Sequence, residues 1–201
     1  MAKLNKEVVS DVQLNPFLQK RWSPRAFLPT KVEKDVLKRI FEAGRWAPSS
    51  FNEQPWRFII GVKGEGKTWD KLYSSLVEFN QHWNTNVPVL VLIVAKKIFT
   101  KFPDPNRHYM YDTGQAAAHV TVQTMAEGLY CHQMGGFSIE KARELFHIPQ
   151  DYEPCAMMAI GYLGDPATLP ADLQKSEAEP RSRLPLSSIA FEEDWERKFP
   201  F

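Results

Sequence analysis

One run of apolar residues constrains the fold more than any other part of the sequence. Residues 89–95 read Val-Leu-Val-Leu-Ile-Val-Ala, without a polar or charged side chain. A short continuous run that is rich in β-branched residues is typical of a central strand buried on both faces. The chain must therefore supply helices or a second layer to cover each face of the sheet that contains this strand.

Shorter patterns predict the elements around this strand. Helical spacing of apolar residues, together with capping residues, predicts helices that start at Pro16 and that span residues 32–46, 68–80, 109–129 and 138–146. Two further apolar runs, at 56–62 and 155–163, predict strands, and residues 168–183 are polar and predicted to be irregular. Three strands are too few for a regular alternation of strands and helices. We therefore expect an α+β fold, in which helices surround a mixed sheet.

Length, charge and cysteine content limit the class of protein. A chain of 201 residues suits one domain over 1–201, and a net charge of +1 argues against a nucleic-acid binder. Cys131 and Cys155 form no CxxC pair, and the N-terminus has no apolar signal core. These features predict a reduced, cytoplasmic chain with no membrane partner, because the longest apolar run is also too short to span a bilayer.

The two ends of the chain are predicted to differ from the domain between them. Residues 1–15 are expected to form an N-terminal extension. Residues 184–201 contain Ile189, Phe191, Trp195 and Phe199, and such an apolar tail is unlikely to stay in water. We expect this C-terminal arm to pack on a partner subunit.

A stiff polar loop is the strongest candidate for a binding site. Pro48 and Pro55 bracket the sequence Ser-Ser-Phe-Asn-Glu-Gln, and each proline also restricts the residue before it. The hydroxyls and carboxamides of this loop donate and accept hydrogen bonds without charge, which suits a flat heteroaromatic ring. The alternative is a helix-to-strand turn whose polar groups satisfy their own backbone.

A basic cluster precedes this loop. Arg21, Ser23 and Arg25 follow a short helix and are expected to line one extended edge. Two guanidinium groups and a hydroxyl suit a phosphate, because arginine binds phosphate through two parallel hydrogen bonds. The alternative is a solvated basic surface.

Several motifs together resemble the FMN-dependent nitroreductase family. They are Arg-Trp-Ser-Pro-Arg-Ala-Phe at 21–27, Ala-Pro-Ser-Ser-Phe-Asn-Glu-Gln-Pro-Trp at 47–56, Gly-Gly-Phe at 135–137 and Ile-Gly-Tyr at 160–162. The resemblance spans roughly residues 21–183. It implies an intertwined homodimer in which a C-terminal strand joins the partner's sheet, with non-covalent FMN at the subunit interface. It also implies that NADH or NADPH reduces the flavin at N5, and that a nitroaromatic or quinone then takes two electrons in ping-pong order.

The resemblance also implies roles for individual residues. Arg21, Ser23 and Arg25 would meet the phosphate and ribityl groups, and Arg181 and Arg183 would close over the phosphate. The loop would contact the ring from the other subunit, Asn80 would hydrogen-bond the ring, and two glycines would offer backbone N–H groups near N5. The complete cofactor-binding set is Arg21, Trp22, Ser23, Arg25, Pro48, Ser49, Ser50, Asn52, Gln54, Asn80, Gly135, Gly136, Arg181 and Arg183.

Other positions depart from the family pattern or have weaker assignments. Trp83 stands where many members place a lysine near the ring, Trp22 replaces a frequent basic residue, and Gly135 replaces a glutamate of some members. Tyr109, Met110 and Tyr111 are predicted to gate the substrate. No side chain is assigned a catalytic role, because the flavin carries the chemistry, and no His/Cys cluster predicts a metal site.

Two other functions fit parts of the sequence. Residues 61–68 match G-x-x-x-x-G-K-[ST], the pattern of a phosphate-binding P-loop, and they follow a strand and precede a helix. A P-loop enzyme also needs an acidic residue after a second strand, but the strand at 89–95 is followed by Lys96 and Lys97. The second alternative is a flavin carrier without catalytic activity.

Overall fold

A computed structural model describes residues 6–201 of the chain. Residues 1–5, the start of the predicted N-terminal extension, lie outside the described residues. The helices are α1 (Pro16–Lys20), α2 (Lys34–Arg45), α3 (Thr68–Ser75), α4 (Glu78–Asn84), α5 (Tyr109–Ala126), α6 (Ile139–Phe146) and α7 (Ala171–Ala178), with short 3₁₀ turns η1 (Ser50–Asn52), η2 (Pro166–Thr168) and η3 (Leu186–Ser188). The strands are β1 (Trp56–Val62), β2 (Val89–Lys96), β3 (Tyr130–Met134) and β4 (Tyr152–Gly161).

The strands form one sheet in the order β1-β2-β4-β3, and every neighbouring pair is antiparallel. Strand β2 lies inside this sheet, and all of residues 89–95 are buried, as the apolar run predicted. The fold is α+β, which confirms the predicted class. The mixed character expected of the sheet is not seen among these four strands, so a parallel neighbour would have to come from outside the described chain.

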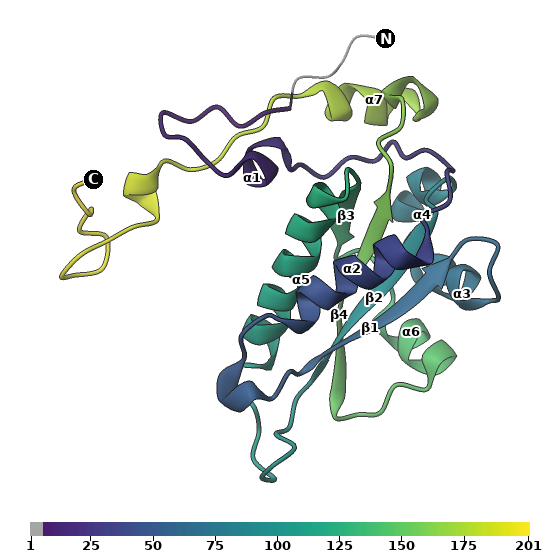
Figure 1. Cartoon of the computed structure of the whole chain (residues 1–201), viewed down its shortest axis with the longest axis horizontal. Helices are drawn as coiled ribbons and strands as arrows, with labels where there is room; N and C mark the ends of the chain where they lie inside the picture. The colour runs from purple at the N-terminus through teal and green to yellow at the C-terminus, as the bar shows by residue number, and fades with distance from the viewer. Residues whose placement is uncertain (1–5) are drawn as a thin grey trace.

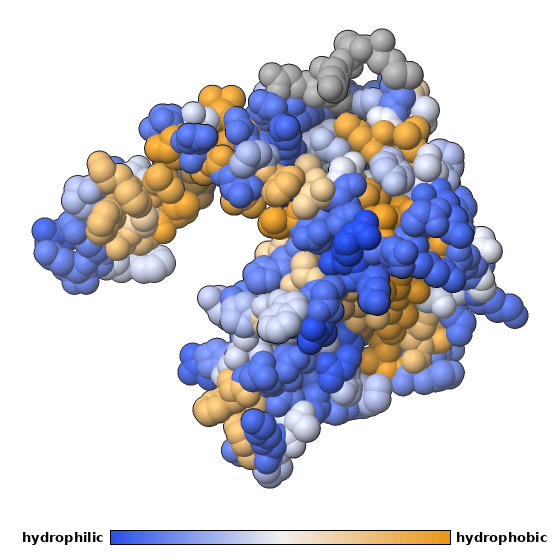
Figure 2. Space-filling model, in the orientation of Figure 1, coloured by the Kyte–Doolittle hydropathy of each residue, from blue (hydrophilic) through white to orange (hydrophobic). Residues whose placement is uncertain are grey.

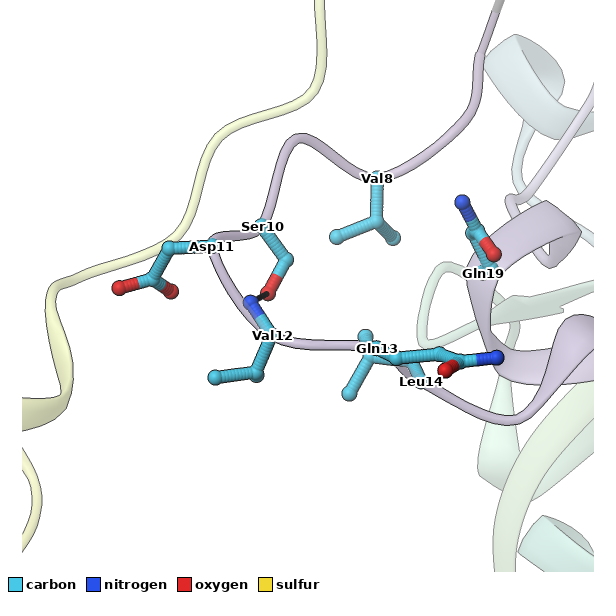
Figure 3. A pocket seen from close by; sticks show the side chains of 7 residues that line it. All are labelled: Val8, Ser10, Asp11, Val12, Gln13, Leu14 and Gln19. Carbon is cyan, nitrogen blue, oxygen red and sulfur yellow. Dashed lines mark hydrogen bonds between the residues drawn. The ribbon is translucent and has the colours of Figure 1, made fainter.

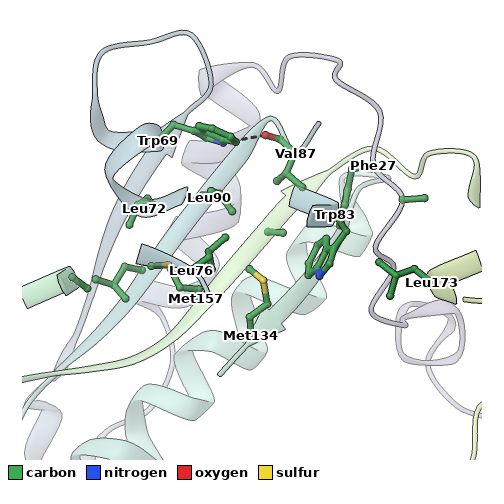
Figure 4. Close-up of a cluster of buried hydrophobic side chains, with 14 of the residues drawn as sticks. Phe27, Trp69, Leu72, Leu76, Trp83, Val87, Leu90, Met134, Met157 and Leu173 are labelled. Atoms are coloured by element: carbon green, nitrogen blue, oxygen red, sulfur yellow. Dashed lines mark hydrogen bonds between the residues drawn. The ribbon is translucent and has the colours of Figure 1, made fainter. Parts of the chain in front are cut away.

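Strand β2 divides the core into two layers because alternate residues of a strand point to opposite faces. Leu90, Leu92 and Val94 face a cluster built with α3, α4 and α6, part of which Figure 4 shows. Val89, Val91 and Ile93 face the other cluster, which α2 and α5 cover. Helices therefore cover both faces, as a doubly buried strand requires (Figure 1).

Three element predictions were wrong. The helix expected over 68–80 is broken into α3 and α4, because Leu76 is extended and pairs with Phe137 while the N–H of Val77 donates to the carbonyl of Gly136. Strand β3 was not predicted. Residues 168–183, expected to be irregular, contain α7, whose Leu173 and Glu177 are buried against the body of the molecule.

The chain beyond α7 leaves the body of the molecule as an arm (Figure 1). Leu184, Leu186, Ile189 and Trp195 expose more than half of their surface, and Figure 2 shows apolar patches along the arm. Among the residues that the structure describes, no helix combines the length and the apolar character needed to cross a membrane.

Candidate functional site

A cavity of about 240 Å³ collects most of the predicted phosphate-binding residues. The segment after α1 forms one wall, and the end of α7 with the segment that follows it forms the other. The lining residues are Lys6, Arg21, Trp22, Ser23, Arg25, Ser176, Glu177, Glu179, Pro180, Arg181 and Arg183. The tertiary structure thus joins two basic segments that lie about 150 positions apart in the sequence.

Three arginines of this cavity repel one another. Burial lowers the pKa of Arg21, and Arg183 lowers this pKa further. Burial likewise lowers the pKa of Arg181, and both Arg21 and Arg183 add to the effect. Because guanidinium groups stay charged in proteins, an anion bound between them would offset this repulsion.

Arg25 lines the same cavity but already has protein partners. Its Nη1 lies 3.8 Å from Oε2 of Glu177 and donates to the hydroxyl of Ser176 at 3.3 Å. Oε1 of Glu177 accepts from the backbone N–H groups of Arg25 at 2.8 Å and Ala26 at 3.3 Å. The carboxylate of Glu177 is buried, so it fixes α7 against the segment that carries Arg25. Arg25 Nε has no hydrogen-bond partner among the described residues.

Asn80 and Gly136, predicted to contact a ring, lie side by side. Nδ2 of Asn80 donates to the carbonyl of Gly136 at 2.9 Å, and a Cβ at Gly136 would lie 2.6 Å from that Nδ2. A Cβ at Gly135 would meet no atom within 4 Å. Gly135 is therefore open to a ligand. Gly136 has no room for a side chain, because the side chain of Asn80 occupies that position.

Trp83 is buried next to this pair. Its Nε1 donates to Oδ1 of Asn80 at 3.3 Å, and its ring lies 4.7 Å from the imidazole of His132, between centroids. The carbonyl of Pro24 accepts from Nδ1 of His132 at 2.9 Å. Burial lowers the pKa of His132 to about 4, although the Pro24 contact opposes the shift, and Arg25 and Arg21 lower it further. Trp83, which was predicted to stand where the resembling family often has a lysine, therefore packs against a neutral imidazole.

The proline-bracketed loop has an unusual backbone. Phe51, Asn52 and Gln54 all have positive φ angles, which non-glycine residues adopt rarely and often at functional sites. The N–H of Ser50 donates to Oδ2 of Asp112 at 3.0 Å, and the N–H of Gln54 donates to Oγ of Ser49 at 3.0 Å. One hydrogen bond within the loop and one to α5 thus hold this backbone conformation. Asn52 remains exposed.

A second loop supports the first. The carboxylate of Glu53 accepts from the N–H and the hydroxyl of Thr100, and it lies 3.6 Å from Nζ of Lys96. Phe51 is 70% exposed and packs edge-on against Phe99 and Phe102. Sequence reasoning missed this contact, because nothing in the sequence pairs residue 51 with a loop some fifty positions later.

The predicted substrate gate lies at the start of α5. Tyr111 is 72% exposed and Met110 is 49% exposed, and Sγ of Cys155 lies 3.3 Å from Sδ of Met110. Tyr109 begins the helix. These residues are on the same end of α5 as Asp112, which holds the proline-bracketed loop.

One chain does not bring the two halves of the predicted site together. Asp112 in the first turn of α5 holds the loop at one end of this helix, whereas strand β3, beside the arginine cavity, bonds to Thr121 further along it. An 18-residue helix is roughly 27 Å long. Figure 1 shows η1 at one end of α5 and α1 at the other.

Two other candidate positions do not suit a phosphate. A Cβ at Gly61 would lie 2.6 Å from the backbone N of Trp69, so helix α3 packs directly on the start of the P-loop pattern. A hollow of about 270 Å³ in the N-terminal loop is lined by Val8, Ser10, Asp11, Val12, Gln13, Leu14 and Gln19, without a cation (Figure 3).

Comparisons with known proteins agree with one another. A model of the nitroreductase family matches residues 18–82 and 65–162 of the chain. A crystal structure of an oxidoreductase containing FMN is 33% identical, with a TM-score of 0.89, and the match covers 98% of this chain and 100% of the other.

Two more relatives match over most of their length. A nitroreductase family protein from Clostridium difficile is 27% identical with a TM-score of 0.70, and the match covers 89% of this chain and 97% of that one. A Bacillus subtilis protein, provisionally named NAD(P)H nitroreductase YdgI, is 27% identical over 89% of this chain and 98% of its own.

Proposed function

Because the chain belongs to the nitroreductase family, we propose that it is an FMN-dependent oxidoreductase. In this proposal NADH or NADPH reduces non-covalently bound FMN, and a nitroaromatic, a quinone or a similar small acceptor takes two electrons in a ping-pong cycle. The observation that carries the proposal is the cavity in which Arg21, Arg181 and Arg183 meet beside Ser23. The FMN named in a solved relative and the NAD(P)H in the name of another support the same reaction.

The residues of the cavity fit the phosphate end of FMN. The lining has five cationic side chains against two carboxylates, and one of these, Glu177, is paired with Arg25. A phosphate dianion would remove the repulsion among the three arginines, and their guanidinium groups would donate to its oxygens in pairs. The hydroxyl of Ser23, which accepts from Arg21 Nη1 at 3.3 Å, would add a neutral donor.

The residues around Asn80 fit the ring end. When bound, FMN supplies a ring that accepts hydride and passes on two electrons. Gly135 leaves room for close approach of the ring to the backbone, and Asn80 presents a carboxamide already oriented by Gly136 and Trp83. The chain itself binds and orients the ring and limits access of water to it.

The proposed site is completed by a second copy of the chain. The loop at 48–54 lies at the far end of α5 from the arginine cavity, so its carboxamides would reach the ring of the partner's cofactor. The exposed apolar arm at 184–201 would pack on that partner. The site would then lie at the interface of a homodimer, and the same interface would place Tyr109, Met110 and Tyr111 near the acceptor.

Absorption spectroscopy tests the proposal. The purified protein should show a flavin spectrum, or acquire one with added FMN, and NADH or NADPH should bleach it without oxygen. A nitroaromatic or a quinone should restore the colour. Flavin that binds but is not bleached would instead indicate a carrier. A protein that takes up no FMN would contradict the proposed function.

A further inference from the structure

The N-terminal segment places an additional cation at the arginine cavity. Lys6 precedes the first helix by ten positions, yet its side chain is only 8% exposed and lines the cavity. Its Nζ donates to the carbonyl of Glu179 and lies 5.2 Å from the centroid of the Trp22 ring. No pattern in the sequence indicates this role, because a lone lysine near a terminus is usually solvated.

Two reciprocal contacts hold Lys6 in this position. Its ammonium bonds to the backbone of the C-terminal segment, at Glu179, while Nη1 of Arg181 donates to the carbonyl of Lys6 at 2.8 Å. The N–H of Val8 also donates to the carbonyl of Gln19 at 3.1 Å, and this contact turns the segment back toward α1 (Figure 3). The N-terminal and C-terminal segments thus brace each other beside the cavity that both of them line.

A role that is only structural does not explain why the group that holds the two segments together is the charged ammonium of Lys6. Burial lowers the pKa of Lys6, so the ammonium loses hydration there, and the neighbouring Arg181 disfavours its charge as well. Glu177 and Glu179 offset part of this cost. An ammonium has three donors, and the contacts among the described residues use one of them. A phosphate in the cavity would accept from the others and would balance a charge that the unliganded protein holds at a cost.

We propose that Lys6 is a cofactor-binding residue whose ammonium contacts the FMN phosphate, and that the brace between Lys6 and Arg181 slows release of the cofactor. The inference rests on the proposed function, since it requires that FMN occupies the cavity. It adds a residue outside the region that the family model matches, and it gives the N-terminal extension a function.

The test compares FMN with riboflavin, which has the same ring and ribityl chain without the phosphate. In the full-length chain, Lys6→Met removes the charge and keeps an unbranched side chain that is one atom shorter. We expect it to weaken FMN binding about 10- to 100-fold, the range of a charge-assisted contact, and to speed FMN dissociation. Riboflavin affinity should not change, and Lys6→Arg should retain most of the FMN affinity. Lys20→Met, at an exposed lysine nearby, is the control.

Flavin fluorescence gives both affinities and dissociation rates without any turnover. Equal losses for FMN and riboflavin would show a structural tie only and would overturn the inference, as would an unchanged FMN affinity in Lys6→Met. If the wild-type chain binds FMN in these cases, the proposed function stands and the role of Lys6 alone fails. If the wild-type chain binds neither flavin, both are overturned.

Discussion

At the scale of single residues, two arginines show that the role of a charged side chain depends on where it lies in the fold. Arg21 is partly buried among other cations, whereas Arg39 is an exposed arginine that forms a two-bond pair with Glu127. Both are arginines on the same chain. Only the first lacks a carboxylate partner in the described residues and lies in a cavity of the size and charge that a phosphate needs.

Arg21→Ala should therefore weaken FMN binding about 10- to 100-fold, since a hydrogen bond to a charged group contributes roughly 1.5–3 kcal/mol. Isothermal titration of the apoprotein with FMN measures the change. Arg39→Ala is the matched control and should leave FMN affinity as it is. Equal affinity in Arg21→Ala and the wild type would refute the phosphate assignment.

His132 makes stability depend on pH. Burial lowers its pKa to about 4, below its ordinary value of 6.5. Between these pH values the unfolded chain binds more protons than the folded chain. The stability that the neutral His132 contributes is therefore fully present above pH 6.5 and is lost as the pH falls. By linkage, the loss from this group between pH 7 and pH 5 is ~2 kcal/mol.

Urea unfolding at pH 7 and pH 5, for the wild type and for His132→Gln, measures this effect. The difference between the two proteins isolates His132, because the other titrating groups are common to both. The wild type should lose more stability than the variant. A variant with an equally steep pH dependence would contradict the burial of a neutral His132.

At the scale of elements, the break between α3 and α4 positions the residues proposed to bind the ring. Leu76 pairs with Phe137, and Val77 bonds to Gly136, so the end of β3 is tied to the start of α4. Asn80 thereby reaches Gly136. The apolar periodicity over 68–80 predicts one helix, and the tertiary pairing at residue 76 overrides it.

Two neighbouring glycines test this arrangement. Gly136→Ala should displace the Asn80 side chain, whose Nδ2 lies 2.6 Å from the new Cβ, and should lower the free energy of unfolding by about 1–3 kcal/mol. Gly135→Ala meets no atom within 4 Å and should leave the stability of the apoprotein unchanged. A fall in its FMN affinity would place the ring against the backbone at residue 135, and an unchanged affinity would place the ring elsewhere. Chemical denaturation and FMN titration of both variants separate the two effects.

At the scale of the whole molecule, one chain keeps the two groups of predicted cofactor contacts apart. The segment after α1, which lines the arginine cavity, and the proline-bracketed loop lie at opposite ends of α5 (Figure 1). Each half has its own local support, Glu177 for the cavity and Asp112 for the loop. The proposed homodimer would join a cavity from one chain to a loop from the other.

Mixing two defective chains tests this assembly. Arg21→Ala impairs the cavity, and Asn52→Trp, at an exposed loop position, would block the loop. Co-expressed with different affinity tags and purified as heterodimers, the two should bind FMN at one intact site, although each variant alone binds poorly. Heterodimers that bind no more FMN than the parent variants would show that cavity and loop of the same chain act together.

Local periodicity and short motifs were enough to predict the buried strand, the α+β class and the polar residues of the candidate site. The helix starts predicted at residues 16 and 138 have capping residues in the structure, because the side chains of Asn15 and Ser138 accept from backbone N–H groups. These are interactions between residues a few positions apart, so the pattern of the sequence contains them.

The tertiary structure was needed to show which groups lie together. It paired Arg25 with Glu177 across 152 positions, brought Lys6 beside Glu179, and divided the predicted cofactor contacts between two ends of α5. It also added β3 and α7, whose formation depends on burial against the rest of the chain. Contacts between distant residues have no local pattern, since their free energy comes from packing and charge pairing that exist only once the chain has folded.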